Sequence, residues 1–184
     1  MKFIPQSIPD VILITPTVHK DSRGYFYETF NQDIFESNIC CSVNFCQDNE
    51  SKSTKGVLRG LHYQLPPYEQ AKLVRVIDGD VLDVALDLRK SSKTFGHHVA
   101  LELSSKNQHQ VFIPRGFAHG FLVLSDSATF VYKVDNFYSP ESERGIAFND
   151  ASLAINWKLP IESIHVSDKD RFYPTLNNTR EFFT

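Results

Sequence analysis

Two short segments of this sequence bring histidine, arginine and glycine together. The first, residues 55–64, reads Lys-Gly-Val-Leu-Arg-Gly-Leu-His-Tyr-Gln and contains Arg59 and His62. The second, residues 112–121, reads Phe-Ile-Pro-Arg-Gly-Phe-Ala-His-Gly-Phe and contains His119. An unperturbed imidazole titrates near ~6.5, so a histidine can accept a proton at neutral pH or bind a metal ion. The two segments are therefore candidates for proton transfer or for metal binding.

The second segment also carries Pro-x-Gly-x-x-His, which resembles the second motif of cupin barrels. Metal-binding cupins use two histidines and a glutamate from a first motif together with this later histidine. Here the first motif reads His62, Tyr63 and Gln64, so that His62, His119 and Glu69 remain as ligands. A metal site needs several converging ligands, commonly imidazole and carboxylate. We therefore expect no metal and no cofactor.

Short runs of β-forming residues, separated by turn residues, must position these side chains. They span 11–14, 24–30, 56–64, 73–77, 81–88, 99–103, 111–113, 117–124 and 128–134. Asp78-Gly79, between two of them, is a strong hairpin signal. A helix is expected over 31–37 with Asn31 as its N-cap, and one or two more after Pro160. Many short strands with little helix indicate one all-β domain over residues 1–184, a sandwich or a barrel.

Alternation along the strands sorts the polar side chains by face. Asp83 and Asp87 share one face of residues 81–88, and Asp83 faces either water or a polar cavity. His119 and Tyr132 each lie on an otherwise apolar face of their strands. A polar group buried there has to be hydrogen-bonded. For these two residues a satisfied core role stands beside a catalytic one.

The spacing between Arg59 and His62 conflicts with a shared site. His62 follows Arg59 by three positions, an odd spacing, so in a regular strand their side chains point to opposite faces. Gly60, between them, would permit a bulge that re-aims one of the two. The sequence leaves both arrangements open.

The composition restricts the possible partners and compartment. The chain has 184 residues, a net charge of −3 and 41% apolar residues, so no basic field predicts nucleic-acid binding. The apolar run 11–14 is too short for a signal peptide or a membrane span. Cys40, Cys41 and Cys46 are crowded and odd in number, unlike a secreted disulfide framework. We expect reduced cysteines, no membrane partner and a cytoplasmic protein.

A set of motifs, taken in order over about residues 12–176, resembles the dTDP-4-dehydrorhamnose 3,5-epimerase family. They are Asp-Ser-Arg-Gly-Tyr-Phe-Tyr-Glu (21–28), Gln-Asp-Asn (47–49), Arg-Gly-Leu-His-Tyr-Gln (59–64), Gln-Ala-Lys-Leu-Val-Arg (70–75), Phe-Ala-His-Gly-Phe (117–121), Tyr-Lys (132–133), Tyr-Ser-Pro-Glu-Ser-Glu (138–143) and Ser-Asp-Lys-Asp (167–170). No single motif identifies the family, but the ordered set is specific. The resemblance implies a cupin-type double-stranded β-helix, or jelly-roll barrel, with a few short peripheral helices.

The resemblance also implies a reaction, the conversion of dTDP-4-keto-6-deoxy-D-glucose to dTDP-4-keto-L-rhamnose by epimerisation at C3 and C5. The C4 ketone acidifies the hydrogens on both carbons, so the reaction needs a base, an acid on the opposite face and a cation beside the enolate oxygen. By resemblance His62 is the base and Asp170 its carboxylate partner, Tyr132 is the acid and Lys72 is the cation. The product belongs to dTDP-L-rhamnose synthesis, usually for a surface polysaccharide.

A second group of residues is implied to bind the substrate. The positions that surround the diphosphate, nucleotide and sugar are Arg23, Arg59, His119 and Lys169, and the polar positions near the nucleotide are Gln47, Asn49, Glu28 and Glu143. Phe26 and Tyr138 resemble the aromatic pair that sandwiches thymine. In the family Arg23, Phe26 and Glu28 come from the neighbouring subunit, which implies a homodimer with shared active sites.

Other functions use parts of the same residue set. The same base, cation and acid can stop after one carbon, as in a mono-epimerase, and a 3,4-ketoisomerase uses a related barrel. A metal-dependent cupin oxygenase would need bound iron. A non-catalytic nucleotide-sugar binding module would keep Arg23, Phe26 and Tyr138 but would not need the base and the acid.

Overall fold

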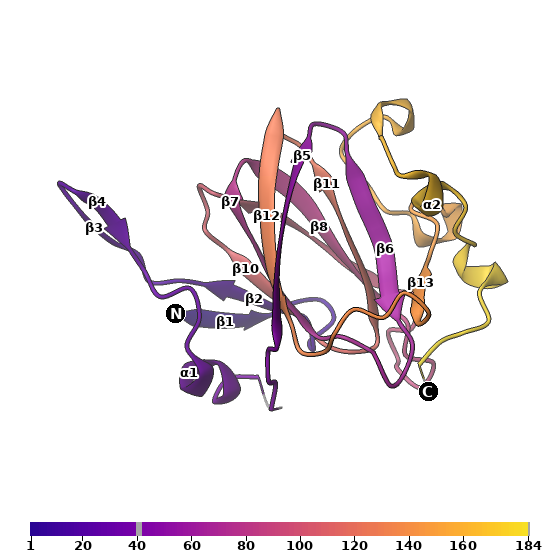
Figure 1. Ribbon diagram of the computed structural model, residues 1–184, viewed down its shortest axis with the longest axis horizontal. Coiled ribbons are helices and arrows are strands. Elements are labelled where there is room, and N and C mark those ends of the chain that lie inside the picture. Colours follow the sequence, from indigo (N-terminus) through magenta and orange to yellow (C-terminus); the bar gives the residue numbers. More distant parts are fainter. Residues whose placement is uncertain (40–41, 184) are drawn as a thin grey trace.

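The computed structural model describes residues 1–39 and 42–183, and over these residues the chain is mostly antiparallel sheet. Within this part it forms a six-stranded sheet, a five-stranded sheet that faces it and a small two-stranded hairpin (Figure 1). The strand order is β1-β2-β10-β7-β12-β5 in the larger sheet and β13-β6-β11-β8-β9 in the smaller one. This arrangement confirms the expected cupin-type jelly roll.

The bounds of the elements are as follows. The six-stranded sheet contains β1 (Lys2–Pro5), β2 (Ile12–Thr15), β5 (Gln47–Thr54), β7 (Lys72–Asp78), β10 (Gln110–Ile113) and β12 (Ser127–Val134). The five-stranded sheet contains β6 (Leu58–Gln64), β8 (Asp80–Asp87), β9 (His98–Ser104), β11 (Phe117–Val123) and β13 (Glu143–Gly145). The hairpin consists of β3 (His19–Asp21) and β4 (Gly24–Phe26).

The helices are short and lie outside the sheets, as expected. Helix α1 (Gln32–Glu36) begins after Asn31, whose side chain accepts a hydrogen bond from the Ile34 amide. After Pro160 come the 3₁₀ turn η2 (Ile161–Ser163), helix α2 (Asp168–Arg171) and the turn η3 (Leu176–Asn178), and η1 (Ala151–Leu153) precedes them. Among the described residues, no helix is long and apolar enough to cross a membrane.

Strand β8 of the five-stranded sheet is buried on both faces, which explains why apolar residues lie on both sides of it and only Asp83 interrupts them between Val81 and Leu86. Val81 and Ala85 face the six-stranded sheet, where the stacked rings of Phe121 and Phe130 lie 4.0 Å apart. Residues on the other face, such as Leu82 and Leu86, pack against Trp157 and Phe183 in a second core cluster. These two residues belong to the C-terminal segment, which covers this face (Figure 1). Asp83 therefore points between the sheets and not to water; it does not line the cavity itself but is hydrogen-bonded to His119, which does.

A register shift in β6 resolves the conflict between Arg59 and His62. His119 pairs with His62 and Phe121 pairs with Arg59, so two residues of β6, Gly60 and Leu61, oppose the single residue Gly120 of β11. This extra residue is a β-bulge, and it places Arg59 and His62 on the face of the sheet shared by His119 and Phe121. Gly60 lies at the bulge with a φ of +138°, and a side chain on it would collide with the Gly120 backbone.

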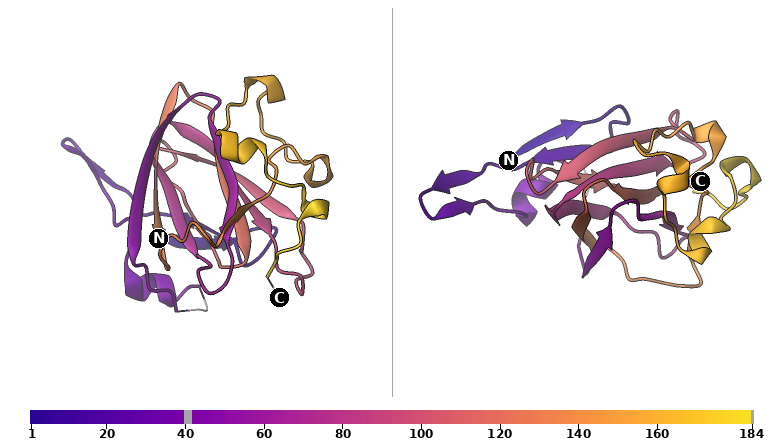
Figure 2. Two further views of the ribbon diagram at one scale, coloured as in Figure 1. Left: turned by 45° about the vertical axis from the view of Figure 1, so that its right-hand side comes forward. Right: turned by 90° about the horizontal axis from the view of Figure 1, so that it is seen from above.

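The two-stranded hairpin projects away from the body of the molecule. Figures 1 and 2 show β3 and β4 extending beyond the sheets, at the end opposite to the C-terminal segment. Tyr25 and Phe26 on β4 are 64% and 68% exposed. At its base the buried Gln110 side chain donates a hydrogen bond to the Thr29 carbonyl (2.8 Å) and so ties the hairpin to the sheet. We call residues 19–28 the arm.

Of the three cysteines, Cys46 is exposed and carries a free thiol. Cys40 and Cys41 lie outside the described residues, and the expectation for them stays a prediction.

Candidate active site

A cavity of about 510 Å³ opens between the two sheets and is closed on one side by the segment that carries α2. It is lined by all four residues predicted for proton transfer, which are His62, Lys72, Tyr132 and Asp170. Three residues predicted to bind substrate also line it, namely Arg59, His119 and Lys169. Residues far apart in the sequence therefore meet in one polar space.

His62 and Asp170 form a hydrogen-bonded pair in this cavity. His62 Nε2 lies 2.7 Å from Asp170 Oδ1, and Asp170 is buried. Burial alone would raise the pKa of Asp170, but the hydrogen bonds from His62 and the Gly60 amide keep that pKa below its ordinary value. An ionised Asp170 holds the imidazole proton on Nε2 and leaves Nδ1 as the nitrogen that can accept a proton.

Local structure fixes both members of this pair. The Ser167 hydroxyl caps α2 by accepting a hydrogen bond from the Asp170 amide (3.2 Å), which holds Asp170 at the cavity wall. The Tyr173 ring meets the His62 ring edge to face, with 5.7 Å between the centroids. Gly145 pairs with His62, and a side chain there would occupy the position of the Tyr173 ring. The role of Tyr173 was not foreseen from the sequence, because no pattern relates it to His62.

Tyr132 and Lys72 reach the cavity from the opposite sheet. Tyr132 lies on β12 and Lys72 on β7, both in the six-stranded sheet, whereas His62 lies on β6 in the five-stranded sheet. Burial raises the pKa of Tyr132 although Arg59 opposes the shift, so its phenol stays protonated at neutral pH. His62 and Tyr132 thus stand on opposite walls of the cavity.

Lys72 presents a poorly solvated ammonium group to the cavity. Burial lowers the pKa of Lys72 to about 8, while the carboxylates of Asp83 and Glu143 act in the opposite direction. At neutral pH the ammonium group is therefore charged, but it loses its proton more readily than an ordinary lysine. A poorly solvated ammonium group is suited to stabilising negative charge that develops on a bound ligand.

His119 forms a second histidine–aspartate pair. His119 Nε2 lies 2.7 Å from Asp83 Oδ2, and both side chains are buried. Burial lowers the pKa of His119 although Asp83 and its hydrogen bond oppose the shift, so the ring is neutral at pH 7. His119 is thus a buried, hydrogen-bonded core residue and also lines the cavity, so the geometry is consistent with both roles considered from the sequence. The sequence left open whether Asp83 faces water or a cavity and did not reveal its partner.

At the mouth of the cavity Glu143 connects two predicted binding residues. Glu143 Oε2 accepts hydrogen bonds from the Tyr138 hydroxyl (2.8 Å) and from Lys169 Nζ (2.7 Å). These contacts lower the pKa of Glu143, although its burial acts against them. Tyr138 remains 54% exposed, so its ring is accessible to a ligand.

The polar strand β5 carries Gln47 and Asn49, the two other residues that were predicted to bind the nucleotide from within the same chain. Gln47 Nε2 donates to Asn49 Oδ1 (2.8 Å), and both side chains are partly buried. Two residues further, Ser51 also lines the cavity, and the Ser53 hydroxyl accepts a hydrogen bond from Arg59 Nε (3.1 Å). Ser51 and Ser53 were not predicted, because serines in a polar run give no signal in the sequence.

Seven of the ten predicted binding residues do not line the cavity of their own chain. Four of them are described above, namely Gln47, Asn49, Tyr138 and Glu143. The other three, Arg23, Phe26 and Glu28, belong to the arm, which projects from the body (Figure 2). The Arg23 side chain is 87% exposed and pairs with Asp21 on the same hairpin, with 2.6 Å between Nη2 and Oδ2. Glu28 accepts a hydrogen bond from Asn31 at the start of α1 (3.2 Å).

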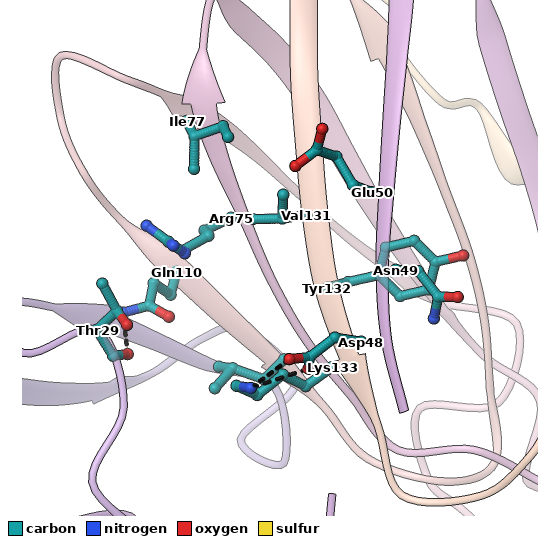
Figure 3. A pocket seen from close by; sticks show the side chains of 11 residues that line it. Thr29, Asp48, Asn49, Glu50, Arg75, Ile77, Gln110, Val131, Tyr132 and Lys133 are labelled. Atoms are coloured by element: carbon teal, nitrogen blue, oxygen red, sulfur yellow. Dashed lines mark hydrogen bonds and ion pairs between the residues drawn. The ribbon is translucent and has the colours of Figure 1, made fainter. Parts of the chain in front are cut away.

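A second hollow, of about 380 Å³, lies on the outer face of the six-stranded sheet. Figure 3 shows Arg75 and Val131 on this side of the sheet, whereas the Tyr132 and Asn49 side chains point to the other side. Lys133 at its edge is paired with Asp48 at 2.8 Å. The residues that line it include no histidine, so the groups suited to proton transfer gather in the first cavity.

Within residues 1–39 and 42–183, no group of three or more histidine, cysteine or carboxylate side chains is arranged to hold a metal ion.

Comparison with known proteins agrees with this geometry. Residues 5–178 match the model of the family described as dTDP-4-dehydrorhamnose 3,5-epimerase. A relative of that name from Shigella flexneri is 57% identical over 170 residues, which cover 92% of this chain and 93% of the relative.

Solved structures show the same likeness. The crystal structure of a dTDP-4-dehydrorhamnose 3,5-epimerase from Elizabethkingia anophelis NUHP1 is 49% identical and has a TM-score of 0.94, with 97% of each chain covered. A dTDP-6-deoxy-D-glucose-3,5-epimerase from Legionella pneumophila Philadelphia 1, in complex with dTDP-4-keto-L-rhamnose, is 46% identical and has a TM-score of 0.93. The alignment covers 97% of this chain and 94% of that one. The chain is an isomerase and belongs to the dTDP-4-dehydrorhamnose 3,5-epimerase family.

Proposed function

We propose that this enzyme epimerises dTDP-4-keto-6-deoxy-D-glucose at both C3 and C5 and so forms dTDP-4-keto-L-rhamnose. The observation that carries the proposal is the arrangement of the cavity, with His62 on one sheet and Tyr132 on the other. Inversion at carbon requires a proton to leave from one face and another to arrive on the opposite face. The ligand of the Legionella pneumophila relative supports this class of substrate.

The proposed mechanism is a sequence of proton transfers. His62 removes the proton from C3, the electron pair passes into the C3–C4 bond, and the C4 oxygen becomes an enolate. Asp170, 2.7 Å from His62, stabilises the imidazolium, and Lys72 stabilises the enolate oxygen. Tyr132 then gives its proton to the carbon from the opposite face. Before the second half-reaction, water accepts the proton from the His62 imidazolium and returns one to the Tyr132 phenolate, which restores the base and the acid. The same steps at C5 then complete the inversion, and none of them needs a metal or a cofactor.

The binding roles follow from where the charged groups lie. Arg59 and Lys169 line the cavity and offer cations to the diphosphate, and the planar guanidinium suits paired hydrogen bonds to phosphate oxygens. His119 is neutral and can bond to the sugar or the nucleotide. The polar side chains of Gln47 and Asn49, together with Glu143, would bind the nucleotide. The exposed ring of Tyr138 would stack on thymine.

The arm supports a homodimer with shared active sites. Arg23 and Phe26 are strongly exposed, and neither lines the cavity of its own chain. An aromatic ring and a guanidinium group presented on a projecting hairpin are suited to reach a nucleotide held by a second chain. We propose that Arg23, Phe26 and Glu28 complete the site of the partner.

The direct test is NMR of dTDP-4-keto-6-deoxyglucose incubated with the enzyme in deuterated water. Deuterium at both C3 and C5, with an L-configured product, would establish the double epimerase. Exchange at one carbon would point to a mono-epimerase with the same cavity. If neither carbon exchanges, the substrate assignment is wrong.

Replacing Tyr132 with phenylalanine should separate exchange from inversion. Because His62 and Lys72 are intact, deuterium should still enter the substrate, whereas protonation from the opposite face should fall by about 100-fold, the lower end of the usual contribution of a general acid. The effect should be larger at C5. The ratio of exchanged substrate to inverted product, measured by NMR, checks this. An unchanged product stereochemistry and rate would refute the acid role.

Replacing Arg23 with alanine should raise KM by about 10-fold with kcat largely retained, because a bond to a charged ligand contributes roughly 1.5–3 kcal/mol and this one is partly solvated. The matched control is Lys20→Ala, which removes an exposed cation from the same hairpin without touching a predicted binding position. A KM that is the same for both variants would contradict the shared site. Steady-state kinetics on the two proteins provide the measurement.

A further inference from the structure

Gln64 occupies the position where metal-binding cupins place a second histidine, and no step of the proposed reaction uses it. It is buried, with 5% of its surface exposed. It lies on β6 two residues after His62. A buried carboxamide with two donors and one acceptor requires partners for all of them.

The carboxamide of Gln64 is fully bonded, and two of its partners flank one residue. Its Nε2 donates to the Phe137 carbonyl (3.2 Å), and its Oε1 accepts from the Ser139 amide (2.8 Å). The second Nε2 hydrogen bonds to the Tyr68 carbonyl at 2.5 Å. The residue between the two peptide groups that it holds is Tyr138. Gln64 thus gives the loop the donor and acceptor that a neighbouring strand would offer.

Tyr138 links this loop to the catalytic pair. Its hydroxyl donates to Glu143, which also binds Lys169, and Lys169 directly precedes Asp170. Its ring is 54% exposed, and its side chain is not buried by the protein. The backbone on both sides of Tyr138 is therefore fixed by Gln64, while the ring itself is left accessible at the mouth of the cavity.

We propose that Gln64 is a positioning residue that presets Tyr138 to receive the base of the nucleotide. This inference rests on the proposed function, in which Tyr138 stacks on thymine. A loop that is ordered before the ligand arrives saves the entropy of ordering it on binding. The contribution of Gln64 should therefore appear in ligand affinity and KM more than in kcat.

The first variant is Gln64→Met, which keeps the length of the side chain and removes all three hydrogen bonds. We expect the Kd for dTDP, measured by calorimetry, to rise by about 3- to 10-fold, the effect of ordering one side chain on binding. KM should rise with it, and kcat should change less. The matched control is Gln70→Met, because Gln70 also donates a carboxamide hydrogen bond to this loop (2.8 Å to the Asn136 carbonyl) but does not flank Tyr138. Its Kd should stay within about 2-fold of wild type.

A double-mutant cycle with Tyr138→Ala separates positioning from a general loss of structure. If Gln64 acts through Tyr138, Gln64→Met should change the Kd for dTDP little once the ring is gone. If the effects of Gln64→Met and Tyr138→Ala on the Kd simply multiply, the proposal is overturned.

The Gln64→Glu variant adds a readout that a structural role alone would not move. An ionised carboxylate faces two carbonyl oxygens and cannot donate, but a protonated one regains a donor. Relative to wild type at each pH, the dTDP affinity of this variant should recover as the pH falls, whereas Gln64→Met should show no recovery. If the dTDP affinities of the two variants depend on pH in the same way, the donor hydrogen bonds of Gln64 do not position Tyr138.

Hydrogen exchange of the Ser139 amide, followed by NMR without ligand, tests the hydrogen bonds of Gln64 on both sides of Tyr138 independently of function. The protection of this amide should be lost in Gln64→Met and retained in Gln70→Met. Retained protection in both variants would show that Gln64 does not hold the backbone beside Tyr138. Wild-type protein that neither binds dTDP nor exchanges the substrate hydrogens would refute the proposed function, and with it the role of Gln64 in nucleotide capture.

Discussion

Replacing His62 with alanine should abolish deuterium exchange at C3 and at C5. The buried carboxylate of Asp170 holds His62 Nε2 at 2.7 Å, which leaves Nδ1 to take the proton from carbon. A positioned general base contributes about 10²–10⁴-fold, and here both half-reactions depend on the same base, so we expect a loss of at least about 10³-fold. The measurement is NMR of the substrate in deuterated water.

The same variant should still bind dTDP. The residues proposed for the diphosphate and the nucleotide lie elsewhere in the cavity or at its mouth, so the Kd should change by less than about 3-fold, since no direct ligand contact is removed. His97→Ala is the matched control, because His97 is an exposed histidine outside the cavity. Normal exchange in His62→Ala would refute the assigned base. Loss of dTDP binding would show that the change had damaged the fold of the site.

Replacing Lys72 with methionine should lower kcat by about 10²–10³-fold, the effect of removing one donor from an oxyanion site. Methionine keeps most of the volume of the side chain and removes the charge. Because burial already lowers the pKa of Lys72 to about 8, the charged form is disfavoured in the folded protein. The variant should therefore melt at a higher temperature than wild type while it loses activity.

The lowered pKa of Lys72 also predicts the alkaline limb of the wild-type profile. An ordinary lysine stays charged to about pH 10.4, whereas Lys72 loses its proton as the pH rises through about 8. The value of kcat/KM should fall over this range, because it reports the ionisation of the free enzyme. A flat profile from pH 7 to well above 8, or a Lys72→Met variant with both lower stability and unchanged kcat, would refute the cationic role.

Elements with local signals could be predicted from the sequence. The hairpin between β7 and β8 turns at Asp78-Gly79, where Gly79 adopts a φ of +79°. Helix α1 starts where the N-cap Asn31 predicts it. In both cases a few adjacent residues determine the backbone, so no tertiary information is needed.

Strand β5 was missed because its surroundings are polar on both sides. Its sequence, Gln-Asp-Asn-Glu-Ser-Lys-Ser-Thr, has no apolar alternation. It is an edge strand, and the side chains on one of its faces are exposed. On the other face Ser51 lines the cavity and the Ser53 hydroxyl binds Arg59. A strand of this kind is held by its hydrogen bonds to β12 rather than by burial of its own side chains.

The candidate site was predicted by resemblance, and the structure explains how the residues meet. Local rules left open whether Arg59 and His62 share a face, and only the pairing of β6 with β11 shows the extra residue that brings them together. Asp83 and Tyr173 were not assigned, because their partners His119 and His62 are distant in the sequence and no local pattern relates them. Tertiary contacts decide these roles.

The projecting arm has a consequence for how the enzyme would respond to its own abundance. If Arg23, Phe26 and Glu28 act in a neighbouring chain, a single chain is an incomplete catalyst, and turnover at low protein levels grows with the square of the number of chains rather than in proportion to it. The exposed hairpin would then make the specific activity depend on protein concentration, low on dilution and constant once nearly all chains are paired.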